Sequence, residues 1–293
     1  MRTRRTTRSH LVGFLLVVLG VTSCAQAPSD VAVFHMPSGP SRLLPLSADV
    51  PVLSARLRSL GDTGATVVVV GDTVVIQGGG SLPAPASFFV KTGHFSLRPV
   101  LCGAPAYTSS AAARSPNHLP RCGAQYQTSE ANLAVNVNTG QPGTTILADP
   151  IFASYPSTTA DDADQPSGTV LLPAIDQQEY PRFVLGPAQM TNPVVASAQA
   201  QFDGTINAWS VDATLTPSGA AQFDRAARAA FHQYLAFDMD GAVVMAPLIQ
   251  PLQSVFISFG GKMEISGTLT KSSARQLAAL LVSGPLPAPL DLR

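Results

Sequence analysis

Apolar and polar positions follow the clearest pattern in the last sixty residues of the chain. Two apolar runs flank Asp240-Gly241, a pair that is typical of a tight turn between antiparallel strands. A short strand is predicted at 262–266. Thr270 then stands where it can cap a helix, and Gly284-Pro285 is expected to end that helix. The apolar face of the helix would consist of Ala274, Leu277, Ala278 and Leu281.

The same patterns predict elements upstream. Residues 208–215, AWSVDATL, alternate apolar and polar side chains, which is the period of a half-buried strand. Thr216-Pro217 is a good start for a helix. The apolar stripe of that helix would be Phe223, Ala226, Ala227, Ala230 and Phe231. Nearer the N-terminus a helix is predicted at 53–60, with strands at 31–36, 65–70, 73–77 and 91–100.

The first residues have the form of an export signal. Arg2–Arg8 is positively charged, and the apolar run 11–21 is shorter than the roughly 20 residues of a membrane-spanning helix. Val21-Thr22-Ser23-Cys24 is similar to the site at which bacterial lipoproteins are cleaved and acylated, so Cys24 is predicted to carry lipid. Several fatty acyl chains, such as palmitate, would anchor the protein firmly. The alternative is an ordinary secretory signal with a chance cysteine.

Charge and composition exclude one class of partner. The chain has 293 residues, of which 45% are hydrophobic and 12% are charged. Without residues 1–23 it carries 14 basic and 18 acidic residues, a net charge of −4. An acidic protein with no basic stripe is a poor nucleic-acid binder. No apolar run of about 18 residues follows Cys24, so no second membrane span is expected.

The order of the C-terminal motifs resembles the first extracytoplasmic domain of the SecD family, and most closely its head subdomain. That family has a hairpin motif, an "I-S-G-x-x-T" motif before an Ala/Leu-rich helix, and "SG-x-LPAPL". The matching positions are Asp240, Gly241, Val243, Ala246, Pro247 and Ile249, then Ile265, Ser266, Gly267 and Thr270, then Ser283, Gly284 and Leu286–Leu290. Upstream, residues 180–188 are similar to the strand that enters the head, and residues 91–100 to a base strand that ends in "RPV".

The resemblance implies an α+β fold. It has a SecD-like base, a β-α-β unit that is half of a ferredoxin-like fold, and a head subdomain in which a mixed sheet packs against helices. The expected division is a lipoprotein signal peptide at 1–23, a tether at 24–30, a base-like subdomain at 31–101, a Ser/Thr/Pro-rich connector at 102–172 and a SecD head-like subdomain at 173–293.

Two cysteines remain after Cys24, namely Cys102 and Cys122. An exported protein meets an oxidising environment, so a disulfide between them is predicted. Free thiols are one alternative. A metal site that would recruit His118 with Cys122 is another, although so few ligands give it little support.

The sequence offers little catalytic chemistry. His94 lies in a predicted strand and His232 at a predicted helix end, and both are interpreted as structural or surface residues. The cluster Asp161, Asp162 and Asp164 is interpreted as a solvated loop, with a weak calcium site as the alternative. We therefore predict no enzymatic activity, no metal and no cofactor. His94 or His232 beside an aspartate and a hydroxyl in a pocket would favour an enzyme.

The C-terminal hairpin is the candidate binding element. Pro247 and Pro251 suit an edge or a bent arm more than a central strand, and an exposed edge can add an extended peptide as a further strand. The residues predicted to bind a peptide are Val243, Met245, Leu248, Ile249 and Phe256. The alternative is a hairpin that only closes its own core.

Together these observations predict a lipid-anchored, extracytoplasmic, non-enzymatic binding protein at the cell membrane. It would assist protein export or hold a translocated polypeptide, with a polypeptide or a component of the Sec machinery as its partner. The alternative is an envelope lipoprotein that binds a glycan, a lipid or a partner protein and has no role in Sec translocation.

Overall fold

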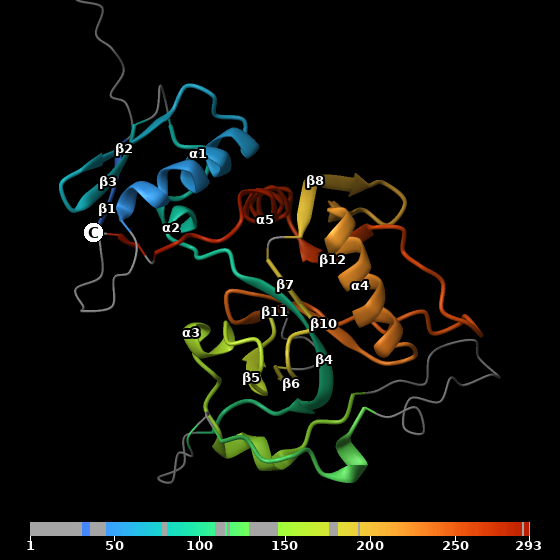
Figure 1. Ribbon diagram of the computed structural model, residues 1–293. Helices are drawn as coiled ribbons and strands as arrows, with labels where there is room; N and C mark the ends of the chain where they lie inside the picture. Colours follow the sequence, from blue (N-terminus) through green and yellow to red (C-terminus); the bar gives the residue numbers. More distant parts are fainter. Residues whose placement is uncertain are drawn as a thin grey trace, which may run out of the picture.

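The computed structural model describes residues 31–35, 45–77, 81–108, 115, 118–128, 146–175, 181–192, 194–288 and 290–292. As expected, the described residues have an α+β fold, with short helices packed on antiparallel sheets (Figure 1). Parallel pairing occurs there only in two isolated bridges, Gly103 with Ala148 and Ala174 with Val243. None of the helices in these ranges has the length and apolar character needed to span a bilayer.

The N-terminal unit is a four-stranded sheet with the order β13-β1-β3-β2. Helix α1 follows β1 and precedes β2, so the expected β-α-β order is present. One face of the sheet buries Phe34, Val74 and Ile76 in a core cluster that includes Leu53 and Leu57 of α1. The elements are β1 (Val31–His35), the 3-10 helix η1 (Leu46–Ala48), α1 (Val50–Ser59), β2 (Thr66–Val70), β3 (Thr73–Gln77), α2 (Ala86–Phe89) and β13 (Asp291–Leu292).

A second sheet lies below the first in Figure 1 and has the order β11-β10-β4-β6-β5, with β7 also paired to β4. Its long central strand is buried along most of its length. The stacked rings of Phe95 and Phe237 join neighbouring strands. The strands are β4 (Phe95–Ala104), β5 (Val170–Pro173), β6 (Arg182–Leu185), β7 (Met190–Thr191), β10 (Leu235–Met239) and β11 (Ala242–Met245).

A third sheet, in the order β12-β9-β8, packs against helix α5. Thr270 caps that helix as predicted, because its hydroxyl accepts a hydrogen bond from the amide of Ser273 in a capping box. Gly284, at φ 74°, ends it. The elements are β8 (Val195–Asp203), β9 (Ala208–Leu215), α4 (Pro217–Ala229), β12 (Lys262–Leu269) and α5 (Lys271–Ser283).

The described parts of the expected connector pack on the second sheet. Cys102 and Cys122 form a disulfide. The buried guanidinium group of Arg182 donates hydrogen bonds to the carbonyl oxygens of Pro105, Phe152 and Tyr155. The short helices of this region are η2 (Ala124–Tyr126), η3 (Pro150–Ser154) and α3 (Ala160–Ala163).

Two strands pair with a different subdomain from the one in which they were expected. Strand β4, expected in the base, pairs with β10 and β6 of the head. Strand β13, expected in the head, pairs with β1 of the base, and the C-terminal end lies beside it (Figure 1). A motif match follows chain order and carries no information about strand pairing, which explains both differences. The division into subdomains remains a prediction.

Among the described residues, the chain passes between base and head at 90–94 and at 284–288, and one side chain contacts both segments. Arg56 of α1 is buried, and its Nη1 donates to the carbonyls of Phe89 (3.2 Å) and Lys91 (2.5 Å). Its Nη2 donates to the carbonyls of Thr92 (3.0 Å) and Gly284 (3.4 Å). Burial lowers the pKa of Arg56 to about 10, so the group stays charged at neutral pH.

Replacement of Arg56 by methionine should lower the free energy of unfolding by about 2–4 kcal/mol, because buried carbonyl groups lose a charged donor. Urea denaturation would measure the loss. Arg58→Met is the matched control, since Arg58 is exposed on the same helix, and it should change stability by less than about 0.5 kcal/mol. Equal effects of the two variants would contradict the role given to Arg56.

Candidate functional site

The predicted hairpin is present and turns where the sequence indicates. Asp240 and Gly241 have φ values of 49° and 74°, as the tight turns that favour an Asp-Gly pair require. Strand β11 is short, and the chain after it continues as an arm that returns beside Tyr234, which forms an isolated bridge with Leu248. The amide of Ile249 donates to the carbonyl of Gln233 (2.9 Å), and the carbonyl of Ile249 accepts from the amide of His232 (3.0 Å), so the arm is held in place.

The arm borders a pocket of about 840 Å³. Strands of the second and third sheets, helix α4 and the loop before β12 supply the rest of its wall. The lining residues are Leu97, Ser197, Ala198, Gln199, Asp212, Ala213, Thr214, Phe223, Leu235, Phe237, Met245, Pro247, Leu248, Ile249, Gln250, Phe259, Lys262, Met263, Glu264 and Ser266. We call this pocket the head groove.

Three of the five residues predicted to bind a peptide line the head groove. Met245 and Leu248 are half-buried, and Ile249 is buried. Val243 is not among the lining residues, because it is buried in a separate core cluster between the second sheet and Ala174. Phe256 packs beneath the guanidinium group of Arg228, 4.5 Å from the ring centre.

One wall of the head groove is an edge strand. Strand β12 pairs with β9 on one side, and no strand in the described ranges pairs with its other side. The register places Glu264 directly opposite Asp212, two like charges that lack an ion pair within the described residues. Lys262 lies further along the same wall, where its Nζ is 3.0 Å from Thr214 Oγ1. The head groove thus combines apolar side chains with a charged margin.

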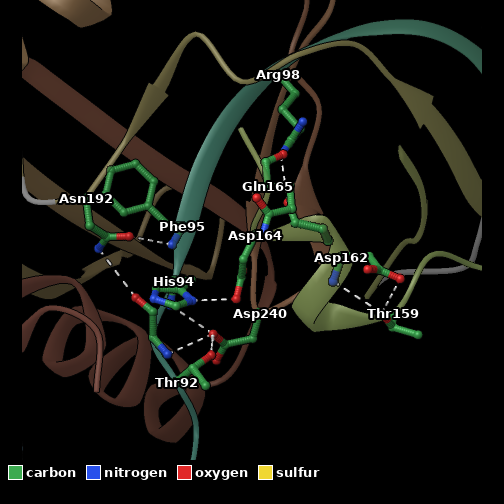
Figure 2. Close-up of polar contacts among 12 residues, drawn as sticks. Thr92, His94, Phe95, Arg98, Thr159, Asp162, Asp164, Gln165, Asn192 and Asp240 are labelled. Atoms are coloured by element: carbon green, nitrogen blue, oxygen red, sulfur yellow. Dashed lines mark hydrogen bonds and ion pairs between the residues drawn. The ribbon is translucent and has the colours of Figure 1, made fainter. Parts of the chain in front are cut away.

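A polar cluster lies at the opposite end of β10, around the junction with the base (Figure 2). The Oδ1 atom of Asp240 accepts hydrogen bonds from the Thr92 hydroxyl (2.5 Å) and from the amides of Gly93 (2.7 Å) and His94 (2.9 Å). Asn192 contacts the same segment, since its Oδ1 accepts from the amide of Phe95 at 2.7 Å. These bonds fix the chain as it enters β4.

Two further pairs extend this cluster into the sheet. His94 Nδ1 lies 2.5 Å from Asp164 Oδ2. Arg98 and Asp238 are both buried, with Nε 3.5 Å from Oδ2. The Ser96 hydroxyl donates to Asp238 (2.7 Å) and accepts from Arg98 Nε (3.1 Å). Burial raises the pKa of Asp238 to about 6, and it lowers the pKa of Arg98.

The condition set for an enzyme is met only in part. His94, Asp164 and Ser96 line a small pocket of about 220 Å³. However, the Ser96 hydroxyl is bonded to Asp238 and Arg98, and no described contact joins it to His94. A serine nucleophile needs a base within hydrogen-bond reach. We therefore interpret the hydrogen bonds of Ser96 with Asp238 and Arg98 as structural.

The remaining predicted residues lie apart from one another. Asp161 and Asp162 are exposed on α3, while Asp164 pairs with His94. His232 contacts the carbonyl oxygen of Gln253 at 2.7 Å. Among the described residues, no three potential metal ligands come together, and Cys122, one member of the metal alternative, is in the disulfide. Cys24 lies outside the described residues.

Comparison with known proteins identifies the class of this fold. Residues 169–288 match the family described as "SecDF, P1 head subdomain". The chain is 37% identical over 108 residues to the protein translocase subunit SecDF of Thermus thermophilus, and the aligned region covers 37% of this chain and 14% of that protein. It is 33% identical over 103 residues to the protein translocase subunit SecD of Syntrophobacter fumaroxidans, and this aligned region covers 35% of this chain and 18% of that protein. The matches therefore span less than a fifth of either relative.

Solved structures extend the likeness beyond the head. A structure of a membrane component SecDF that enhances protein export matches 89% of this chain and 97% of its own chain, with a TM-score of 0.51 and 22% identity. SecDF in its super-membrane-facing form matches 89% of this chain and 29% of its own, with a TM-score of 0.54 and 21% identity. The α+β fold is thus that of SecDF extracytoplasmic domains. Residues 169–288, which include most of the second and third sheets, are the part that is similar to the SecDF head subdomain.

Asp238 should make stability depend on pH. Its folded-state pKa of about 6 lies above the ordinary aspartate value of 3.8. Its stabilising contribution is therefore fully present below pH 3.8 and is lost as pH rises through 6. Between pH 4 and pH 7.5 the free energy of unfolding of the wild type should fall by about 2 kcal/mol relative to that of Asp238→Asn.

Urea denaturation of both proteins across this range would measure the difference. Asp161→Asn, which removes an exposed carboxylate nearby, is the control and should run parallel to the wild type. A pH-independent difference between wild type and Asp238→Asn would mean that Asp238 titrates normally.

Proposed function

We propose that this protein is a non-enzymatic binding protein with a role in protein export, and that its head groove holds an extended polypeptide segment. The observation that carries the proposal is an apolar groove bordered by an edge of β12 that no described strand pairs with, in a domain similar to protein translocase subunits. An edge strand offers backbone hydrogen bonds to any extended sequence. Apolar pockets along the edge then favour apolar side chains.

The composition of the groove wall supports an adaptable site. Met245 and Met263 line the groove together with Leu248, and methionine is flexible and polarisable enough to pack against different partners. The volume of about 840 Å³ lies in the range of binding pockets and would accommodate a few side chains. A site of this kind binds many sequences with modest affinity and performs no chemistry on them.

We also propose that lipid at Cys24 holds the protein at the extracytoplasmic face of the membrane, with the membrane and a polypeptide or a component of the Sec machinery as its partners. Six residues lie between Cys24 and Val31, where β1 begins, so the chain makes seven residue-to-residue steps. A chain of this length reaches at most roughly 25 Å. The base would then lie close to the bilayer surface.

Polypeptide binding can be measured with a permanently unfolded polypeptide, reduced and carboxymethylated, by fluorescence anisotropy. Leu248→Glu places a charge in the apolar wall and should weaken binding about tenfold or more. Ile175→Glu is the control, because Ile175 is 61% exposed and does not line the groove, and its affinity should match the wild type. Thermal unfolding of both variants would separate misfolding from loss of the site. Equal affinity of wild type and Leu248→Glu would rule out the groove.

The anchor has a separate test. Metabolic labelling with a fatty-acid analogue should mark the wild type and leave Cys24→Ala unlabelled and released from membranes. Cys122→Ala, which removes a cysteine of the disulfide, should keep the label. Labelling that persists in Cys24→Ala would remove lipidation from the proposal.

A further inference from the structure

Residues 159–168, which we call the α3 segment, wrap around the buried end of Arg98. Its Nη2 donates to the carbonyls of Ala163 (2.6 Å) and Gln165 (2.9 Å), and its Nη1 donates to that of Gly168 (3.0 Å). Backbone carbonyls are neutral acceptors, so these bonds do not depend on pH between 4 and 9. They fix the end of the segment but not its start.

The start of the α3 segment packs against the β10–β11 turn. A Cβ atom added to Gly241 would lie 2.9 Å from Cα of Ala160, so the two backbones are in close contact. Thr159 caps the short helix, because its hydroxyl accepts from the amide of Asp162 at 3.2 Å. Asp164 then ends the helix with its carboxylate directed at His94 (Figure 2).

The His94–Asp164 pair is the one ion pair between the α3 segment and the sheet among the described residues. The side chain of His94 is 39% exposed and that of Asp164 is 24% exposed, so protons and water reach the pair. When His94 is charged, its hydrogen bond to the carboxylate is charge-assisted, and such bonds are about twice as strong as neutral ones. When His94 is neutral, the segment keeps a weaker contact.

Charge balance around the pair favours the protonated state. The carboxylates of Asp164 and Asp238 face a single permanent cation, Arg98, until His94 takes up a proton. Asp240 faces His94 from the turn and also Arg56 from α1. The hydrogen bond to Asp164 raises the pKa of His94, against the opposing effect of burial. The charged groups that face the pair are Arg56, Arg98, Asp161, Asp164, Asp238 and Asp240.

We propose that the His94–Asp164 pair is a proton-operated latch, which holds the α3 segment on β4 and on the β10–β11 turn when His94 is charged and loosens the segment when His94 is neutral. A histidine with a raised folded-state pKa contributes stability that is fully present below its ordinary value of about 6.5 and is lost as pH rises through the folded value. The segment is therefore closed in mildly acidic solution and looser above neutral pH.

The proposed latch can be tested by measuring two linked quantities in the intact protein. The first is the titration midpoint of His94, from NMR of protein labelled with ¹³C at histidine Cε1 and assigned with His94→Gln. The second is the amide hydrogen exchange of residues 159–168 between pH 5.5 and 8.5, corrected for the intrinsic rate. The midpoint of His94 should be higher in the wild type than in Asp164→Asn. For each pH unit of that difference, the protection of residues 159–168 in the wild type should fall tenfold between pH 5.5 and pH 8.5.

Asp164→Asn should lower the midpoint of His94 to about 6.5 or below and remove the pH dependence of protection. Asp161→Asn removes an exposed carboxylate on the same helix, whose charge is the smallest of the effects that raise the pKa of His94, so it should lower the midpoint far less than Asp164→Asn and should keep the pH dependence of protection. If Asp164→Asn does not fold, His94→Gln replaces it and should show pH-independent protection. A wild-type midpoint at or below about 6.5 would overturn the latch. Corrected protection that stays constant across the pH range would overturn it as well.

Discussion

The arrangement of the two units depends on how residues 91–94 are held. The carbonyl groups of Lys91 and Thr92 accept hydrogen bonds from Arg56, and the amides of Gly93 and His94 donate to Asp240. A buried cation thus binds the carbonyl groups of this short segment, and a carboxylate binds its amides. The opposite charges of Arg56 and Asp240 also attract each other. Since Arg56 also bonds the carbonyl of Gly284, one side chain fixes both places where the chain passes between base and head.

Buried arginines repeat this solution in the head. Arg98 binds carbonyls of the α3 segment, and Arg182 binds those around η3. Each guanidinium group replaces the regular hydrogen bonding that an irregular segment lacks, because it offers several donors in a fixed plane. The connector region is thereby fastened to β4 and β6, which leaves the opposite side of the sheet for the head groove. The polar cluster and the head groove lie toward different ends of β10.

Sequence patterns predicted most of the helices and strands, but they did not predict how most of the strands pair. The caps at Thr216 and Thr270 and the turn at Asp240-Gly241 depend on local chemistry, so they could be predicted. Strand β8 was missed, because its apolar positions are mostly alanine and its burial is partial. The placement of β4 in the head and of β13 in the base, and the roles of Arg56, Arg98 and Asp238, arise from contacts between residues far apart in the chain. Charged residues within otherwise apolar strands, such as Arg98 and Asp238, were the available signal for buried pairs. Met245, Leu248 and Ile249, chosen for their apolar character beside prolines, line the head groove, and their binding of a peptide remains a prediction. The burial of Val243 in another core cluster could not be predicted from that pattern.

Methionine methyl groups give the most direct test of the head groove as the site that holds a polypeptide. Met245 and Met263 line the groove, while Met190 and Met239 are buried outside it, so the chain carries its own reporters and controls. In methyl NMR spectra of methionine-labelled protein titrated with a permanently unfolded polypeptide, the account predicts saturable shifts at Met245 and Met263 with little change at Met190 and Met239. Saturable binding that leaves Met245 and Met263 unshifted, or no binding at all, would contradict it.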